Sequence, residues 1–278
     1  MTYFLDLRAA SCGGSPAADV TPRLGWNPIT IAEMVGQIRG KDVLLGTHGF
    51  NVNREDGINS LSNWEGMLQL GSSSLFFGVL WPGDSKWAPV IDYPFEGDEA
   101  VMSGRLLGPF LDKYFGDAAS LSIVSHSLGA RMVLETISCM NRRVRRLVIM
   151  AGAIDDNCLT GEYRNAAKKV DNISVLASHG DNVLSLAFPA GNFLGGIISC
   201  GHPYWHAALG REGPAAPYPV NIRSGWQIPD AWDYGHLDYL AQITGVPLSL
   251  PVDVPLPPPP PTPIKPAWSA GFVSTRFR

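Results

Sequence analysis

Short apolar runs, each bounded by polar or turn residues, recur along the first two thirds of the chain. Runs such as LFFGVLW at 75–81 and RLVIMA at 146–151 are typical of strands that are buried on both faces. Alternation of apolar and polar residues, as in 3–8, also predicts strands. The strands expected from these patterns are 3–8, 42–46, 75–81, 121–124, 146–151 and 173–178, with a further short strand at 220–223.

Segments with helical spacing lie between the expected strands. Apolar residues recur there at intervals of three or four, which predicts helices at 29–38, 59–70, 98–115, 128–140 and 162–169. The aromatic, proline-interrupted stretch from Trp87 to Tyr93 predicts a loop instead. Strands that alternate with helices at this spacing predict an α/β protein with a mostly parallel, doubly wound sheet and helices on both faces.

The stretch SLSIVSHSLG, residues 120–129, places a serine where an expected strand meets an expected helix. Small residues flank Ser127 at two-residue spacing, because Ser125 precedes it and Gly129 follows it. This pattern is typical of the nucleophile elbow of α/β hydrolases, a tight turn that exposes the serine hydroxyl at the edge of the sheet. Serine replaces the usual first glycine, and its side chain is small enough for that position.

The expected strand at 42–46 runs into the loop THGFNVN, residues 47–53. Gly49 allows the backbone to turn so that the amide of Phe50 points at a bound carbonyl oxygen. The second donor of such an oxyanion hole is the amide of Leu128, which follows Ser127. We expect the ring of His48 to hydrogen-bond the loop rather than to take part in chemistry.

A serine nucleophile needs a histidine base and an acid, which follow it along the chain in this fold. Of the six histidines, His236 lies next to Gly235 in a loop after the last expected strand, so we take it as the base. Asp181 follows the strand at 173–178 and is the preferred acid. The alternatives are the adjacent Asp155 and Asp156, which follow the preceding strand.

The sequence predicts neither a metal site nor an organic cofactor. His202 and His206 have the spacing of a helical zinc site, but Pro203 separates them and no HExxH glutamate is present. The four cysteines are scattered without a CxxC pair, which argues against a zinc site and a disulfide scaffold.

Aromatic residues follow several of the expected strands at the edge that carries the oxyanion loop. They are candidates for the walls of a substrate pocket. Residues 182–215 are rich in glycine and aromatics and show little periodicity, which favours a small cap-like insertion over the site. The candidate pocket residues are Trp81, Trp87, Tyr93 and Phe188.

Composition limits the class of protein. The net charge of −4 gives no reason to expect a nucleic-acid partner. No apolar window is long enough for an integral membrane segment, and the N-terminus lacks the apolar core of a signal peptide, so we expect a cytoplasmic protein. Residues 1–245 are expected to form the catalytic domain, and 246–278 a proline-rich arm.

Four segments carry a family resemblance: THGFNVN (47–53), LWPG (80–83), SHSLGARMVLETI (125–137) and YGHLDYL (234–240). Together they resemble the α/β-hydrolase family DUF900, which has lipase- and esterase-like members. The resemblance covers about residues 40–245. It implies the α/β-hydrolase fold, with Ser127 as nucleophile, His236 as base and an acid that we place at Asp181.

These residues predict a carboxylesterase that forms an acyl-enzyme on Ser127 and acts on a small-molecule ester. The same triad serves amidases and thioesterases, which remain alternatives because fold does not fix function. A non-catalytic, hydrolase-like binding module is the alternative from another class.

Overall fold

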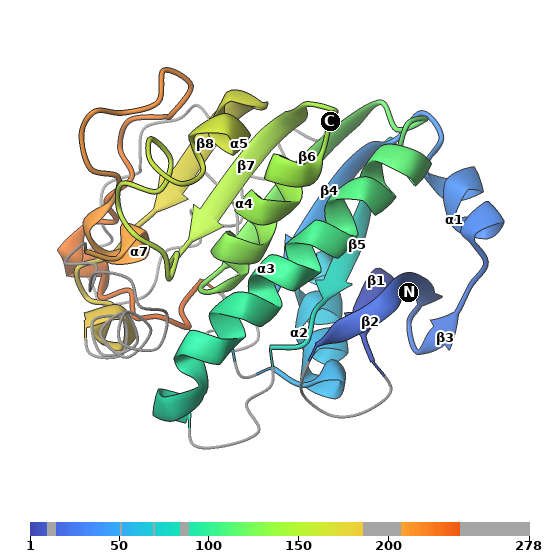
Figure 1. The fold of residues 1–278 in the computed structure, drawn as a ribbon, viewed down its shortest axis with the longest axis horizontal. Helices are drawn as coiled ribbons and strands as arrows, with labels where there is room; N and C mark the ends of the chain where they lie inside the picture. The colour runs from blue at the N-terminus through green and yellow to red at the C-terminus, as the bar shows by residue number, and fades with distance from the viewer. Residues whose placement is uncertain (10–14, 51, 69, 84–88, 186–206, 240–278) are drawn as a thin grey trace.

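In the computed structural model the chain forms one eight-stranded sheet with helices on both faces (Figure 1). The structure describes residues 1–9, 15–50, 52–68, 70–83, 89–185 and 207–239, without the side chains of 89–96. In spatial order the strands are β3 (Asn27–Pro28), β2 (Pro16–Leu24), β1 (Tyr3–Arg8), β5 (Ser74–Leu80), β4 (Asp42–Thr47), β6 (Ser120–His126), β7 (Val144–Met150) and β8 (Val170–Leu176).

The strands from β1 to β8 in this order are parallel, whereas β2 and β3 add an antiparallel edge. The helices connect the strands or follow β8. They are α1 (Ile31–Ile38), α2 (Arg54–Met67), α3 (Pro89–Tyr114), α4 (Gly129–Cys139), α5 (Arg164–Lys168) and α7 (Leu209–Glu212), with a 3₁₀ turn η1 (Asp230–Trp232).

The order of the strands creates a switch point at the centre of the sheet. The chain runs from β4 through α2 to β5, and then back through α3 to β6 on the other side of β4. Because βαβ connections are right-handed, helices of connections that run in opposite directions cover opposite faces. Accordingly α3, α4 and α5 lie in front of the sheet in Figure 1, and α2 lies behind it. Ligand sites of open α/β sheets form at the carboxyl ends of the strands at such a point.

The register aligns the carboxyl ends of the central strands. Thr47 pairs with Ser125, and Ser125 with Ile149. Met150 pairs with Leu176 on the next strand. The loops that follow β4, β6, β7 and β8 therefore start from one edge of the sheet.

The hydrophobic core fills both sides of the sheet, as the apolar runs predict. The interior of β6, from Leu121 to His126, is buried throughout. Helix α4 buries Met132, Leu134 and Ile137 in the core, which are positions that its apolar spacing predicts. The central strands are thus fixed by packing on both faces, and the loops at their ends start from rigid supports.

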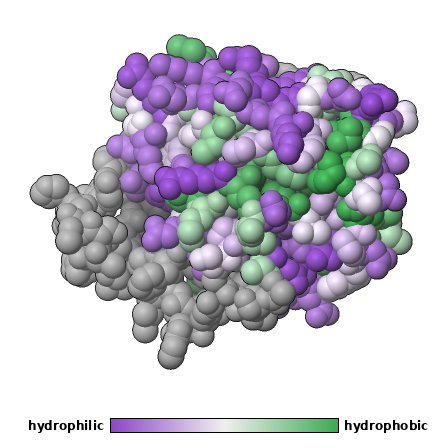
Figure 2. Space-filling model, turned by 45° about the vertical axis from the view of Figure 1, so that its right-hand side comes forward, coloured by the Kyte–Doolittle hydropathy of each residue, from purple (hydrophilic) through white to green (hydrophobic). Residues whose placement is uncertain are grey.

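Hydrophobic residues also reach the surface. Figure 2 brings the right-hand side of Figure 1 forward and shows them gathered across the middle of that face, between more polar regions. The exposed large apolar side chains of the described residues include Met1 and Trp26. Much of any folded surface is apolar, so this exposure alone assigns no role to the face. Among the described residues, none of the helices combines the length and hydrophobicity needed to cross a bilayer.

Several local predictions differ from the structure, and the helix expected at 59–70 is α2 at Arg54–Met67. Helix α3 begins at Pro89, so part of the expected loop from 87 to 93 is helical. Residues 220–223 form one isolated bridge, between Ile222 and Ile173, rather than a strand. The antiparallel strands β2 and β3 have no counterpart in the prediction. The arm at 246–278 and most of the cap-like segment at 182–215 lie outside the described residues.

Candidate active site

Ser127 lies in the turn between β6 and α4, with a backbone φ of +53°. A left-handed conformation is rare outside glycine and asparagine and is held only where the surroundings fix it. Here the amide of Ser127 donates to the carbonyl of Met150 at 3.0 Å, and its carbonyl accepts from the amide of Ala153 at 3.1 Å. The loop after β7 therefore holds the turn in a strained shape, which is the geometry expected of a nucleophile elbow.

The two small residues beside Ser127 are both buried, and close packing requires one of them, Gly129. A Cβ atom on Gly129 would meet the carbonyl oxygen of His48 at 2.5 Å, so a larger residue would force the loop after β4 away. Ser125 is fully buried, and its hydroxyl is 3.5 Å from the carbonyl oxygen of Val148. Serine thus replaces glycine at this position without disturbing the sheet.

Ser127, His236 and Asp181 form a continuous hydrogen-bonded chain. The Nε2 atom of His236 lies 2.9 Å from the Oγ atom of Ser127. Its Nδ1 atom lies 2.7 Å from Oδ2 of Asp181, whose side chain is fully buried. A carboxylate only accepts, so Nδ1 carries the hydrogen and Nε2 of the neutral ring is left to accept the serine proton. The structure therefore brings together the three residues that the sequence singles out.

The loops that carry Asp181 and His236 are joined to each other. The hydroxyl of Ser178 donates to the carbonyl of Tyr234 at 2.6 Å and accepts from the amide of Gly180 at 3.2 Å. The second oxygen of Asp181, Oδ1, accepts from the amide of Leu184 at 2.9 Å. Both carboxylate oxygens of Asp181 are thus engaged, and its orientation toward His236 is fixed from two sides.

The loop after β4 lies directly against the elbow. A Cβ atom on Gly49 would meet the Cβ atom of Ser127 at 2.8 Å, so only glycine lets the backbone come this close. The amide of Phe50 belongs to the next residue of that loop. The amide of Leu128 stands at the start of α4, where the first amides of a helix have no intrahelical acceptor. Both predicted oxyanion donors therefore belong to segments in contact with, or adjacent to, Ser127.

Trp81 supports this loop. Its ring is fully buried and stacks on His48, with centroids 5.6 Å apart, and its Nε1 atom donates to the carbonyl of His48 at 3.0 Å. In turn, Nδ1 of His48 donates to the carbonyl of Gly49 at 2.9 Å, which agrees with the expected structural role of His48. The sequence analysis predicts that Trp81 lines a substrate pocket, and the structure differs. The side chain of Trp81 has no exposed surface and packs against the loop that follows β4.

His126 is a site residue that the sequence analysis did not select. It is buried beside Ser127, and its Nε2 atom is 2.8 Å from the carbonyl oxygen of His236. Burial, reinforced by repulsion from His236, lowers the pKa of His126 from 6.5 to about 3. The ring is therefore neutral at ordinary pH and donates through Nε2, because a carbonyl can only accept. Its place before the nucleophile is visible in the sequence, but its partner 110 positions away is not.

The other residues named in the sequence analysis are not part of this chain of contacts. Asp155 and Asp156, the alternative acids, lie in the loop after β7, and the carboxylate at His236 Nδ1 is that of Asp181. Tyr93 lies in α3, but its side chain is not described. Trp87, Phe188, His202 and His206 fall outside the described residues. No group of three or more potential ligands within the described ranges is arranged to hold a metal ion.

Comparison with known proteins gives one family match. Residues 28–211 match the family described as "Alpha/beta hydrolase of unknown function (DUF900)". A search of curated proteins gives no match. A solved structure titled "Crystal structure of esterase PE8" is similar over 71% of this chain and 86% of its own, with 14% identity and a TM-score of 0.38. That score is too low for the esterase to carry an argument about this chain.

Proposed function

We propose that this chain, which belongs to the DUF900 family and has the α/β-hydrolase fold, is a serine hydrolase that cleaves carboxylic esters. The observation that carries the proposal is the chain of contacts from Ser127 Oγ to His236 Nε2 at 2.9 Å and from His236 Nδ1 to Asp181 at 2.7 Å. A serine hydroxyl is a weak nucleophile by itself, and this arrangement is the one that activates it.

In the proposed reaction, Ser127 Oγ attacks the ester carbonyl carbon while His236 Nε2 accepts the serine proton. His236 then gives that proton to the leaving alcohol oxygen as the carbon–oxygen bond breaks. Water attacks the resulting acyl-enzyme, again with His236 as base, which releases the carboxylic acid and restores Ser127. The carboxylate of Asp181 stabilises the imidazolium that forms in each half of the cycle.

The amides of Phe50 and Leu128 are the proposed donors to the oxyanion. Two features support this assignment. A Cβ atom on Gly49 would lie 2.8 Å from the Cβ atom of Ser127, so the backbone just before Phe50 lies against the nucleophile. Leu128 stands at the N-terminus of α4. Each donor of this kind contributes about 3 kcal/mol to transition-state stabilisation. The donors are backbone groups, so their positions depend on packing around Gly49 and Gly129.

The experiment that tests the proposal is hydrolysis of a p-nitrophenyl ester series from acetate to palmitate, by the wild type and by Ser127→Ala. Ester turnover that the variant lacks supports a serine esterase, and the preferred acyl length reports the depth of the pocket. Parallel assays with an acyl thioester and an acyl anilide separate the esterase from the thioesterase and amidase alternatives. Absence of turnover on all three by the folded wild type would contradict the proposal.

A further inference from the structure

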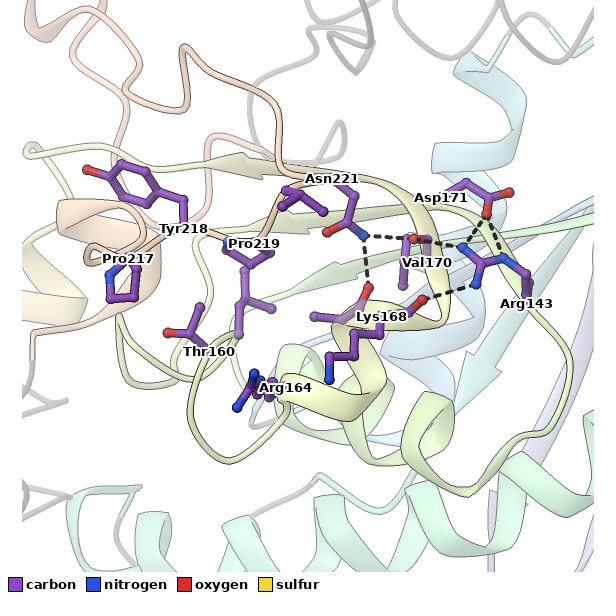
Figure 3. Close-up of a pocket in the computed structure, with 13 residues that line it drawn as sticks. Arg143, Thr160, Arg164, Lys168, Val170, Asp171, Pro217, Tyr218, Pro219 and Asn221 are labelled. Atoms are coloured by element: carbon purple, nitrogen blue, oxygen red, sulfur yellow. Dashed lines mark hydrogen bonds and ion pairs between the residues drawn. The ribbon is translucent and has the colours of Figure 1, made fainter.

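A pocket lies at the opposite edge of the sheet from Ser127. It has a volume of about 650 Å³ and is formed by the start of β8, the helix α5 and the segment 217–221 (Figure 3). Val170 begins β8 and lines the pocket, whereas Asp181 follows the other end of that strand. Seven strand residues span about 20 Å, so the pocket is a site separate from the triad. Its volume is within the usual range for small-molecule sites.

The charges around the pocket are mainly positive, although the whole chain carries a net charge of −4. Arg143, Arg164 and Lys168 line it, against the single carboxylate of Asp171. Arg143 pairs with Asp171 at 2.7 Å and occupies that carboxylate. Within the described part of the chain, the side chains of Arg164 and Lys168 form no ion pair or hydrogen bond. Both come from α5, and both are exposed.

The wall opposite α5 is apolar. Pro217, Tyr218, Pro219 and Val220 follow one another along it, and Figure 3 shows this segment on the other side of the pocket from Arg164. Val220 is fully exposed and Tyr218 is half exposed, so both side chains are open to a molecule in the pocket. Buried Leu159 and Val170 extend the apolar surface into the pocket.

The apolar wall is held rigidly. Asn221 donates from Nδ2 to the carbonyls of Ala167 and Val170, at 2.8 and 2.7 Å, and so joins the segment to both α5 and β8. The ring of Tyr218 packs on Trp226 with centroids 5.1 Å apart. The pocket is therefore a built feature of the fold, with a cationic side and an apolar side in fixed relation.

We propose that this pocket binds a small amphipathic anion, with its carboxylate or phosphate head at Arg164 and Lys168 and its apolar tail against Tyr218 and Val220. Arginine and lysine without carboxylate partners are the side chains that bind such head groups. The volume and the short apolar wall fit a single tail of medium length. The binding is independent of the reaction at Ser127.

The test is calorimetric titration of the full chain with octanoate and with octyl phosphate, each below its micelle concentration. The expected result is saturable binding to the wild type and to Ser127→Ala, with affinity at least about tenfold lower in the double variant Arg164→Ala/Lys168→Ala. Val220→Asp, at a fully exposed position, lowers the affinity by repelling the head group and shortening the apolar wall. Any binding at the triad edge persists in these variants and serves as background.

The matched control is Arg39→Ala/Lys113→Ala, which removes two exposed cations elsewhere and leaves the affinity unchanged. Inorganic phosphate alone tests the head group, 1-octanol tests the tail, and both bind far more weakly than the amphiphiles. Comparison of octanoate with octyl phosphate tells which head group is preferred. Equal affinity for the wild type and Arg164→Ala/Lys168→Ala, equal loss in the control variant, or equal binding of 1-octanol would overturn the proposal.

Discussion

His126 donates the hydrogen on Nε2 to the backbone carbonyl oxygen of His236, across 2.8 Å. This contact joins the residue before the proposed nucleophile to the residue proposed as its base. The two rings also lie close, with centroids 4.9 Å apart. His126 therefore holds the loop of His236 at the distance from Ser127 at which the Oγ–Nε2 hydrogen bond forms.

Replacing His126 separates this positioning role from simple packing. In His126→Leu the donor is lost, and we expect kcat to fall by roughly tenfold to a hundredfold with little change in KM, because a small displacement of a base is costly. In His126→Gln the side-chain amide can still donate to the His236 carbonyl, so most of kcat returns. Equal losses in the two variants, or a loss confined to KM, would contradict the role.

The buried His126 also makes stability depend on pH. The unfolded chain protonates this residue near its ordinary pKa of 6.5, whereas the folded chain does so only at about 3. Between these two pH values the unfolded chain binds one more proton at His126 than the folded chain does. The free energy of unfolding therefore carries no penalty from His126 above pH 6.5, and it decreases as the pH falls below 6.5, by up to about 1.4 kcal/mol per pH unit. Denaturant unfolding of the wild type and His126→Gln from pH 7 to 4 measures it. The variant is expected to show the shallower slope, and parallel curves would refute the assignment.

The variants Asp181→Asn and Asp155→Asn together test which aspartate is the acid of the triad. Asp181→Asn preserves the shape of the side chain but removes the charge that stabilises the His236 imidazolium, so kcat is expected to fall about 10⁴-fold. Asp155→Asn changes an alternative acid, which is not the carboxylate bonded to His236, and should leave kcat within a few-fold of wild type. Steady-state ester hydrolysis by both variants decides between them. A larger loss in Asp155→Asn would move the acid to the loop after β7.

Gly49→Ala tests the proposed oxyanion loop. The new Cβ atom would lie 2.8 Å from the Cβ atom of Ser127, so the loop must retreat and the Phe50 amide moves with it. We expect kcat to fall by about 10²-fold. Gly66→Ala is the control, because nothing lies within 4 Å of its added Cβ on α2, and it should retain full activity. Full activity in Gly49→Ala would place the oxyanion donors elsewhere.

The sequence predicts the parts of this protein that depend on local pattern. The strands around the elbow are continuous apolar runs, and the elbow itself needs small residues at Ser125 and Gly129, so both can be recognised without a structure. The start of α2 also carries a local signal: Asn53 caps the helix by accepting from the amide of Asp56. The expected start at Asn59 is therefore several residues late.

Other features depend on contacts between distant segments. Strand β2 lies near the sheet edge and contains Pro22, which obscures its strand pattern, and it becomes a strand by pairing with β1. The sequence position of Trp81, at the end of a buried strand, suggests a pocket wall, and only the fold shows that its ring stacks on His48. The partner of His126 is a backbone oxygen, for which no side-chain pattern exists. These are tertiary effects that a one-dimensional pattern does not contain.

The activation of Ser127 is the central claim, and covalent labelling tests it without knowledge of the natural substrate. The purified wild type, Ser127→Ala and His236→Ala would each be treated with a fluorophosphonate and analysed by intact-protein and peptide mass spectrometry. The account predicts one adduct per wild-type chain, located at Ser127, and none or very slow labelling in the two variants. A folded wild type that stays unlabelled, or an adduct at another residue, would contradict it.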